Sequence, residues 1–300
     1  MNTPLNILIT GASSGFGRLF ARTLAGEGHN VFATMRDPEG RNTEPAGELK
    51  DFGARAPGRI SVLELDVADE ATVRAAVDRA HAEAGSLDVA INNAGIGAGG
   101  HAEAFTAEQM VHLFDLNVGG VQRVCRAVLP AMRQAGRGLV INISTIMGRI
   151  VIPFSGPYTA SKYALEGLIE SYRYELQGSG VDMVLVEPGG FPTGIGSRML
   201  MPGETEKDRI ASYGAMADMP EKMWGDFMEM LHSGNGPDPQ IVADEVLAII
   251  DTPAGKRPLR VVVDPFMGGE APQAINEMTD RIQAQLLHNM GMAGQSEARA

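Results

Sequence analysis

Tyr158 and Lys162 are four residues apart, the spacing that places two side chains one above the other on a single helix face. A tyrosine hydroxyl has a pKa of about 10 and is a poor acid or base at neutral pH. A neighbouring lysine ammonium favours the phenolate and lowers that pKa. The pair therefore predicts general acid and base chemistry in which Tyr158 exchanges the proton.

Two further polar residues could take part in the same reaction. Ser144 follows a short apolar run, and its hydroxyl could hydrogen-bond a substrate oxygen while negative charge develops there. Each residue also has an ordinary explanation, since Tyr-x-x-x-Lys is common on helix surfaces, Ser144 could cap a strand end and Asn117 could satisfy a turn backbone. Their joint presence points to a catalytic site more strongly than any one of them does.

A glycine-rich segment, residues 10–17 with the sequence TGASSGFG, lies between the first apolar run and a helical pattern. Gly11, Gly15 and Gly17 stand where a strand must turn sharply into a helix and where a pyrophosphate can approach the backbone. The helix N-terminus would face that anion with its positive partial charge. A tight turn without a ligand is the alternative, but the segment favours a dinucleotide-binding loop.

Short apolar runs separated by helical patterns dominate the chain up to about residue 190, and one more run follows later. Their hydrophobicity is continuous rather than alternating, which indicates burial on both faces, as a parallel sheet with right-handed crossovers requires. The sequence therefore predicts an α/β fold with a doubly wound, seven-stranded parallel sheet and helices on both faces. The expected strands are residues 5–10, 30–35, 60–65, 87–91, 138–143, 181–187 and 259–264.

We expect one domain over residues 1–290, because no internal repeat and no Gly-, Pro- or Ser-rich linker divides the chain. An irregular insertion at residues 189–238 is expected to form a substrate lid. An amphipathic C-terminal helix at residues 271–290 is expected to follow, with Ile275, Met278, Ile282 and Leu286 in register. Residues 291–300 are expected to be a disordered tail.

Composition argues against several classes of protein. The chain has 25 Lys and Arg against 37 Asp and Glu, a net charge of −12, and no basic block, so we expect no nucleic-acid partner. No apolar run could span a bilayer, and the first strand starts too early to leave room for a signal peptide, so we expect a cytoplasmic protein with no membrane association. The six histidines show no ligand spacing, and we expect no metal.

The single cysteine, Cys125, lies in a helical apolar stripe. One cysteine excludes an internal disulfide. We expect Cys125 to be a buried packing residue rather than a nucleophile.

The glycine spacing, Gly-x-x-x-Gly-x-Gly after Thr10, resembles the cofactor loop of the short-chain dehydrogenase/reductase family. Other motifs of that family follow in order at the ends of later strands and in later helices, over residues 5 to about 195. The resemblance therefore implies a Rossmann-type fold. These motifs are Asp66-Val67, Asn92-Asn93-Ala94-Gly95, Asn117, Ser144, Tyr158-Thr159-Ala160-Ser161-Lys162 and Pro188-Gly189-Gly190-Phe191-Pro192-Thr193.

The resemblance also implies catalytic roles. It implies that Tyr158 is the general acid and base, that Ser144 holds the substrate oxygen, and that Asn117 and a water connect Lys162 to solvent as a proton relay. The positive nicotinamide ring of the oxidised cofactor would join Lys162 in lowering the pKa of Tyr158. The residues expected to bind the cofactor are Gly11, Ser13, Ser14, Gly15, Phe16, Gly17, Arg36, Asp66, Val67, Asn93, Ala94, Gly95, Tyr158, Lys162, Pro188, Gly189, Phe191 and Thr193.

The end of the second expected strand bears on which nicotinamide cofactor is bound. NAD-binding relatives carry an acidic residue there that binds the ribose hydroxyls, whereas this chain has Met35 followed by Arg36. The Arg36 guanidinium can bind a 2′-phosphate through two parallel hydrogen bonds. We therefore expect NADP(H), with NAD(H) less favoured. Asp37 could instead pair with Arg36 or bind the ribose itself, and Ser14 stands where many NADP-using relatives carry a second basic residue.

The expected lid is rich in methionine, with seven of the 17 methionines between Met199 and Met230, together with Trp224 and Phe227. Methionine adapts to irregular apolar surfaces, so a bulky or variable apolar substrate is one interpretation and packing of the lid on the body is the other. Further apolar residues, Ile146, Met147, Ile150, Ile152 and Phe154, would extend an apolar wall. The segment 31–37 resembles the branch that contains hydroxysteroid and retinol dehydrogenases, which implies an apolar alcohol, ketone or aldehyde as substrate.

Two other functions use related folds. A redox-sensing regulatory protein would bind NADP but would need no tyrosine, serine or lysine in the site, so the four residues favour an enzyme. A sugar-nucleotide epimerase or dehydratase also uses Tyr-x-x-x-Lys, but such relatives usually have a differently spaced glycine loop and a larger C-terminal domain. The resemblance also implies a homodimer or homotetramer, formed through the helices that hold residues 117–132 and 158–177.

Overall fold

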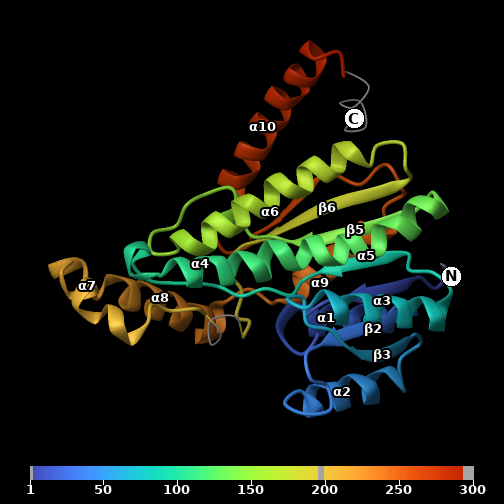
Figure 1. The fold of residues 1–300 in the computed structure, drawn as a ribbon, viewed down its shortest axis with the longest axis horizontal. Helices are drawn as coiled ribbons and strands as arrows, with labels where there is room; N and C mark the ends of the chain where they lie inside the picture. The colour runs from blue at the N-terminus through green and yellow to red at the C-terminus, as the bar shows by residue number, and fades with distance from the viewer. Residues whose placement is uncertain (1–2, 195–198, 293–300) are drawn as a thin grey trace.

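Seven parallel strands form one sheet in the computed structural model, which describes residues 3–194 and 199–292 (Figure 1). The strands lie in the order β3-β2-β1-β4-β5-β6-β7. The predicted seven-stranded parallel sheet is confirmed, and each strand ends within two residues of the expected position. The strands are β1 (Asn6–Ile9), β2 (Asn30–Met35), β3 (Arg59–Glu64), β4 (Val89–Asn92), β5 (Gly138–Ile143), β6 (Val181–Pro188) and β7 (Arg260–Val263).

Helices cover both faces of this sheet and bury two separate apolar cores. This arrangement is the expected doubly wound fold. One face carries α1 (Gly15–Gly26), α2 (Thr43–Gly53) and α9 (Gln240–Asp251), and the other carries α3 (Glu70–Ala84), α5 (Gly120–Ala135) and α6 (Gly156–Glu175).

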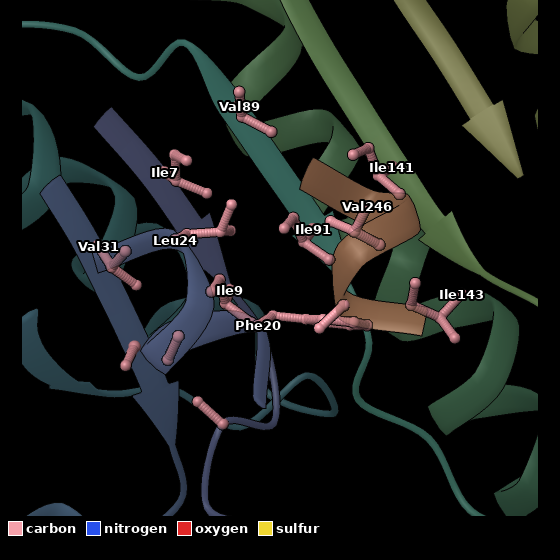
Figure 2. Close-up of a cluster of buried hydrophobic side chains, with 14 of the residues drawn as sticks. Ile7, Ile9, Phe20, Leu24, Val31, Val89, Ile91, Ile141, Ile143 and Val246 are labelled. Carbon is pink, nitrogen blue, oxygen red and sulfur yellow. The ribbon is translucent and has the colours of Figure 1, made fainter. Parts of the chain in front are cut away.

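Neighbouring residues of β1 show why the strands had to be apolar without interruption. Ile7 and Ile9 pack in the core that also contains Phe20 and Leu24 of α1 (Figure 2). Leu8, between them, belongs to the core on the other face of the sheet. Because successive side chains of a strand point to opposite faces, a strand buried on both faces needs apolar residues at most of its positions. Cys125 is buried in this second core, as expected.

The chain reverses its direction of travel across the sheet between β1 and β4, since β2 and β3 lie on one side of β1 and the later strands lie on the other. Such a switch point leaves a crevice outside the carboxyl ends of the strands. The loops after β1, β4, β5 and β6 meet at that edge, and they carry most of the residues selected from the sequence.

Residues 199–239 form helices outside the sheet, including α7 (Lys207–Ala211) and α8 (Met219–Met230), which lie together at one end of the molecule (orange in Figure 1). The segment around Leu200 is tied to the loop after β4. The Leu200 amide donates a hydrogen bond to the Gly97 carbonyl at 2.8 Å, and the Leu200 carbonyl accepts one from the Gly99 amide at 3.1 Å. Residues 195–198 of the expected lid lie outside the described residues, and the lid function stays a prediction.

The C-terminal helix α10 (Glu270–Asn289) extends away from the body of the molecule (Figure 1). Its apolar residues Ile275, Met278, Ile282 and Leu286 are exposed, and Asn276 and Leu287 are among the residues that it buries instead. The amphipathic pattern therefore predicted the position of the helix but not which of its faces packs against the rest of the protein. Most of the expected disordered tail, residues 293–300, lies outside the described residues. No helix within residues 3–194 and 199–292 combines the length and the apolar character needed to cross a bilayer.

Buried and exposed apolar residues should differ in how much they contribute to the stability of the fold. Leu24 is fully buried and Ile282 is 61% exposed. We expect Leu24→Ala to lower the free energy of unfolding by about 2–5 kcal/mol, because it leaves a cavity in the core. Ile282→Ala should change it by less than about 0.5 kcal/mol. Urea denaturation measures both, and equal losses in the two variants would contradict the described packing of α10.

Candidate active site

A cavity of about 600 Å³ opens at the carboxyl edge of the sheet. Residues from the loops after β1, β2, β3, β4, β5 and β6 line it, together with residues from α6 and from the segment after Met199. Of the residues selected from the sequence, those at its wall are Gly11, Ser13, Ser14, Gly15, Phe16, Arg36, Asp66, Val67, Asn93, Ala94, Gly95, Ser144, Tyr158, Lys162, Pro188, Gly189, Phe191 and Thr193. Two selected residues, Gly17 and Asn117, do not line the cavity.

Tyr158 and Lys162 come from the first two turns of α6, which has Pro157 in its first turn. Proline is tolerated there because the first amides of a helix have no partner within the helix. The Lys162 ammonium lies 5.8 Å from the centre of the Tyr158 ring and donates a hydrogen bond to the Ile143 carbonyl at 2.9 Å. The last residue of β5 therefore holds the lysine, and the next residue is Ser144.

Both titratable groups are buried, and burial moves their pKa values in opposite directions. Burial raises the pKa of Tyr158 to about 12, although a hydrogen bond with the Thr145 side chain acts against it. Burial lowers the pKa of Lys162 to about 8, while the negative charge of Glu166 raises it. In the protein alone, loss of hydration on burial disfavours the charged phenolate and moves the pKa of Tyr158 upward. The expectation that Lys162 and the oxidised cofactor together lower this pKa stays a prediction.

The Ser144 hydroxyl is buried at the cavity wall, and within residues 3–194 and 199–292 it has no hydrogen-bond partner. A buried hydroxyl without a partner is costly and therefore unusual. A ligand oxygen at this wall could accept its hydrogen bond. Thr145 also lines the cavity, and its side chain donates to the Pro188 carbonyl at 3.2 Å. Sequence reasoning missed Thr145, although its position next to Ser144 was a usable signal.

Asn117 lies behind the cavity wall, in a π-helical turn (Asp115–Gly119) that joins α4 (Ala107–Phe114) to α5. Its side-chain amide exchanges two hydrogen bonds of 2.9 Å with the backbone of Ile96. It also donates to the Ser161 hydroxyl at 3.0 Å. Asn117 therefore links the loop after β4 to α6, and its direct contacts are with Ile96 and Ser161 rather than with Lys162.

The glycine loop has the geometry of a close backbone approach. Gly11 has a φ of +69°, and a Cβ there would lie 3.0 Å from the Ala94 Cα. The Asn93 side chain donates to the carbonyls of Thr10, at 2.9 Å, and Gly11, at 3.1 Å. Gly17 lies beneath the loop, where a Cβ would be 2.4 Å from the Gly11 carbonyl oxygen and 2.5 Å from the Asn93 amide nitrogen. Gly17 therefore has a packing role, and its expected contact with the cofactor stays a prediction.

Two guanidinium groups lie at the far end of the cavity, after β2. Arg36 and Arg41 both line it, and the nearest carboxylate oxygen of Asp66 is 4.0 Å from Arg36. The Arg41 guanidinium has no ion pair or hydrogen bond within the described ranges. Asp37, which has a φ of +45°, turns its carboxylate into its own loop and accepts the Arg41 backbone amide at 2.9 Å. Sequence reasoning missed Arg41 because only this folded-back loop brings it to the cavity that Arg36 also lines.

The opposite end of the cavity is apolar. Met199, Trp224, Phe227, Met228 and Leu231 line it, together with Ile146, Met147 and Ile152. Two residues of the expected apolar wall, Ile150 and Phe154, are not at this surface. Four of the seven lid methionines, Met201, Met216, Met219 and Met230, are exposed instead. Composition alone predicted the character of this region but not which of its methionines face the cavity.

Comparison with known proteins identifies the family. The family described as short chain dehydrogenase matches residues 5–200. A 3-ketodihydrosphingosine reductase of Bacteroides thetaiotaomicron is 42% identical over 64% of this chain and 65% of its own length. The human 17-beta-hydroxysteroid dehydrogenase type 1 is 38% identical over 68% of this chain and 62% of its own length. The chain thus spans less than two thirds of the length of both relatives.

Solved structures share the fold over most of the chain. A short-chain dehydrogenase from Streptomyces avermitilis is 31% identical, with a TM-score of 0.73 over 95% of this chain and 96% of its own. A metagenomic short-chain oxidoreductase in complex with NADP is 27% identical, with a TM-score of 0.66 over 87% of this chain and 97% of its own. A Burkholderia phymatum enzyme in complex with NAD, 24% identical with a TM-score of 0.74 over 94% and 95% of the two chains, shows the fold alone.

Two glycines of α1 test the geometry of the loop. A methyl group at Gly17 would overlap the Gly11 carbonyl, whereas one at Gly26 would meet nothing within 4 Å. We expect Gly17→Ala to lower the free energy of unfolding by about 1–3 kcal/mol, because backbone must move. Gly26→Ala should be neutral or stabilising by up to about 1 kcal/mol. Thermal denaturation of both variants checks this, and a neutral Gly17→Ala would show that the loop is not packed as described.

Proposed function

The chain belongs to the short chain dehydrogenase family, and we propose that it is an oxidoreductase that uses NADP(H) to interconvert an apolar ketone or aldehyde and its alcohol. One observation carries the proposal. The unpartnered Ser144 hydroxyl shares a cavity wall with the buried Tyr158 and Lys162 side chains, so a polar hydrogen-bond partner, a proton donor and a cation converge on one small volume.

The residues of the glycine loop suit a dinucleotide. Gly11 and Gly15 have positive φ angles at the cavity wall, so the backbone is bare where a pyrophosphate would lie. The first turn of α1 carries no acidic residue, which leaves the positive end of the helix open to an anion. Asp66 and Val67 would bind the adenine end, and the segment 188–193 would bind the nicotinamide end. When bound, NADPH supplies a hydride to the carbonyl carbon of the substrate.

The preference for NADP(H) rests on Arg36 and Arg41. Two planar guanidinium groups beside one cavity can hold the two charges of a 2′-phosphate. Asp37, the carboxylate that could have bound ribose hydroxyls, is committed to the amide of Arg41. This loop therefore presents positively charged groups at the position where an NAD-binding protein needs a hydrogen-bond acceptor for the ribose hydroxyls.

The proton is assigned to Tyr158. With its pKa raised to about 12 by burial, the phenol is protonated at neutral pH and can donate to a carbonyl oxygen that gains charge during reduction. Ser144 would donate a second hydrogen bond to the same oxygen. Lys162 would stabilise the phenolate that remains. Asn117 would hold the first turns of α6 in place through Ser161, and the proposed water relay from Lys162 to solvent stays a prediction.

An apolar substrate agrees with the far wall of the cavity and with the named relatives. Among the described residues, this wall of methionine and aromatic side chains contains no lysine or arginine that could bind a substrate carboxylate or phosphate. The relatives' names include a 3-ketodihydrosphingosine reductase and a 17-beta-hydroxysteroid dehydrogenase, and we propose that this chain, like them, acts on a substrate with a large apolar part. Assembly as a homodimer or homotetramer, implied by the family resemblance, remains a prediction.

Two tyrosines of α6 provide a matched test of the acid. We expect Tyr158→Phe to lower kcat for NADPH-dependent ketone reduction by at least about 10²-fold, the usual contribution of a general acid. Tyr163→Phe removes a hydroxyl that is bonded to the Arg149 carbonyl outside the cavity and should stay within a few-fold of wild type. NADPH absorbance over a size series of ketones and aldehydes measures both variants. A Tyr158→Phe variant within tenfold of wild type would remove Tyr158 from this role.

The two arginines give a separate test of the cofactor. We expect Arg36→Ala and Arg41→Ala each to raise the dissociation constant of NADPH by about tenfold or more, because each removes charge-assisted hydrogen bonds to the 2′-phosphate. Binding of NADH should stay nearly unchanged. Arg55→Ala, away from the cavity, is the control. If calorimetry finds equal losses for NADPH and NADH, the 2′-phosphate does not lie between these arginines.

A further inference from the structure

A buried group of charged side chains joins α6 to β6, β7 and α10, and none of its members lines the cavity. Its centre is Arg260 of β7, whose side chain is only 4% exposed. The guanidinium bonds Glu166 at 2.8 Å and Glu170 at 2.7 Å, both on α6. It also lies 3.5 Å from a carboxylate oxygen of Glu187 on β6 and 3.7 Å from one of Asp280 on α10.

Carboxylates outnumber cations in this group. The four carboxylates named above are accompanied by Arg260 and by Arg149, whose charge acts on Glu187. Burial, together with the charge of Glu166, raises the pKa of Glu187 to about 8, although Asn276 of α10 donates a hydrogen bond to it at 2.8 Å. The surroundings of Glu187 therefore favour its protonated form. Even so, the remaining carboxylates outnumber the two arginines of the cluster. Lys162, one turn before Glu166 on α6, supplies a further positive charge on that helix.

Glu166 is the member of the cluster that reaches the active site. It lies one turn after Lys162 on α6, which places the two side chains on one face of the helix. One of its carboxylate oxygens, Oε1, is buried and has no hydrogen-bond partner among the residues described. A Cβ added to Gly148 would lie 3.2 Å from this oxygen and 2.9 Å from the Ser144 hydroxyl. Only a glycine therefore separates Glu166 from the serine of the site.

We propose that Glu166 is a positioning residue of the active site, whose carboxylate, held in place by Arg260, keeps the positive charge on Lys162. Glu170 binds the same guanidinium but lies a further turn away from Lys162. The proposal therefore assigns the effect to Glu166 itself and not to the integrity of the cluster. Its consequence for turnover rests on the proposed function, whereas its effect on Lys162 does not.

The protonation of Lys162 can be observed directly in the whole protein. The chain has five lysines, and the other four, Lys50, Lys207, Lys222 and Lys256, are exposed. Carbon-13 labelling at lysine Cε therefore gives a small NMR spectrum, in which Lys162→Arg identifies the signal of Lys162. Its titration midpoint in wild type should lie near the value of about 8 that burial gives its pKa.

We expect Glu166→Gln, which keeps the side-chain shape and removes the charge, to lower that midpoint by about one pH unit. Glu170→Gln, the matched control, should leave it in place. The same midpoint in wild type and Glu166→Gln would overturn the proposal. Equal displacements in both variants would also overturn it, because the effect would then come through Arg260. Circular dichroism reports whether each variant is folded.

A wild-type measurement covers the case in which Glu166→Gln does not fold. With glutamate Cδ labelled as well, the Glu166 carboxyl signal, assigned from its loss in Glu166→Asp, should show an inflection at the pH where Lys162 titrates. No inflection there overturns the proposal. Neither titration requires turnover. If no carbonyl compound is reduced, the proposed function fails while the role of Glu166 is still decided.

In the active enzyme, the alkaline limb of kcat/KM for ketone reduction should move to lower pH in Glu166→Gln and stay in place in Glu170→Gln. The ammonium of Lys162 is present below its pKa and is lost as the pH rises through it, so a lower pKa ends activity earlier. An unmoved limb together with a displaced Lys162 signal would contradict the part of the proposal that concerns turnover.

Discussion

The contact between the Lys162 ammonium and the Ile143 carbonyl joins the sheet to α6, and the candidate site depends on it. It fixes the first turns of α6 against the end of β5, beside Ser144. The Lys162 amine and the Tyr158 phenol are both buried there, so neither can be charged without cost. A charge brought into the cavity would therefore change the pKa values of both groups.

The fold supplies this arrangement through its topology. The carboxyl ends of β1, β4, β5 and β6 share one edge because the strands are parallel, and the reversal of the strand order between β1 and β4 leaves a crevice at that edge. The glycine loop follows β1, and the backbone of Ile96, which hydrogen-bonds Asn117, follows β4. Ser144 follows β5, and the segment 188–193 begins at the end of β6. Apolar burial on both faces of the sheet holds these loop origins in place, so a few short loops can converge on one cavity.

Sequence patterns predicted the sheet and most of the residues at the cavity wall, because both follow from local rules: continuous apolar runs for buried strands, glycines at a sharp turn, and a four-residue spacing on a helix. Properties that depend on packing were not accessible. The balance of burial and charge at Tyr158 needs the surroundings of the phenol. Arg41 reaches the cavity only through the turn made by Asp37, and Gly17 serves packing because the Gly11 carbonyl lies against it. The exposed face of α10 follows from the neighbours of Asn276 and Leu287, which no helical periodicity specifies.

The central claim is that burial keeps the Tyr158 phenol protonated until a positive charge enters the cavity. The most direct measurement is the ionisation of Tyr158 alone, from the tyrosinate absorbance difference between wild type and Tyr158→Phe as a function of pH. Without cofactor, the account predicts a midpoint near the value of about 12 that burial gives its pKa. With saturating NADP⁺ it predicts a much lower midpoint, because the oxidised nicotinamide is cationic. A midpoint that stays near that value with NADP⁺ bound would contradict the account.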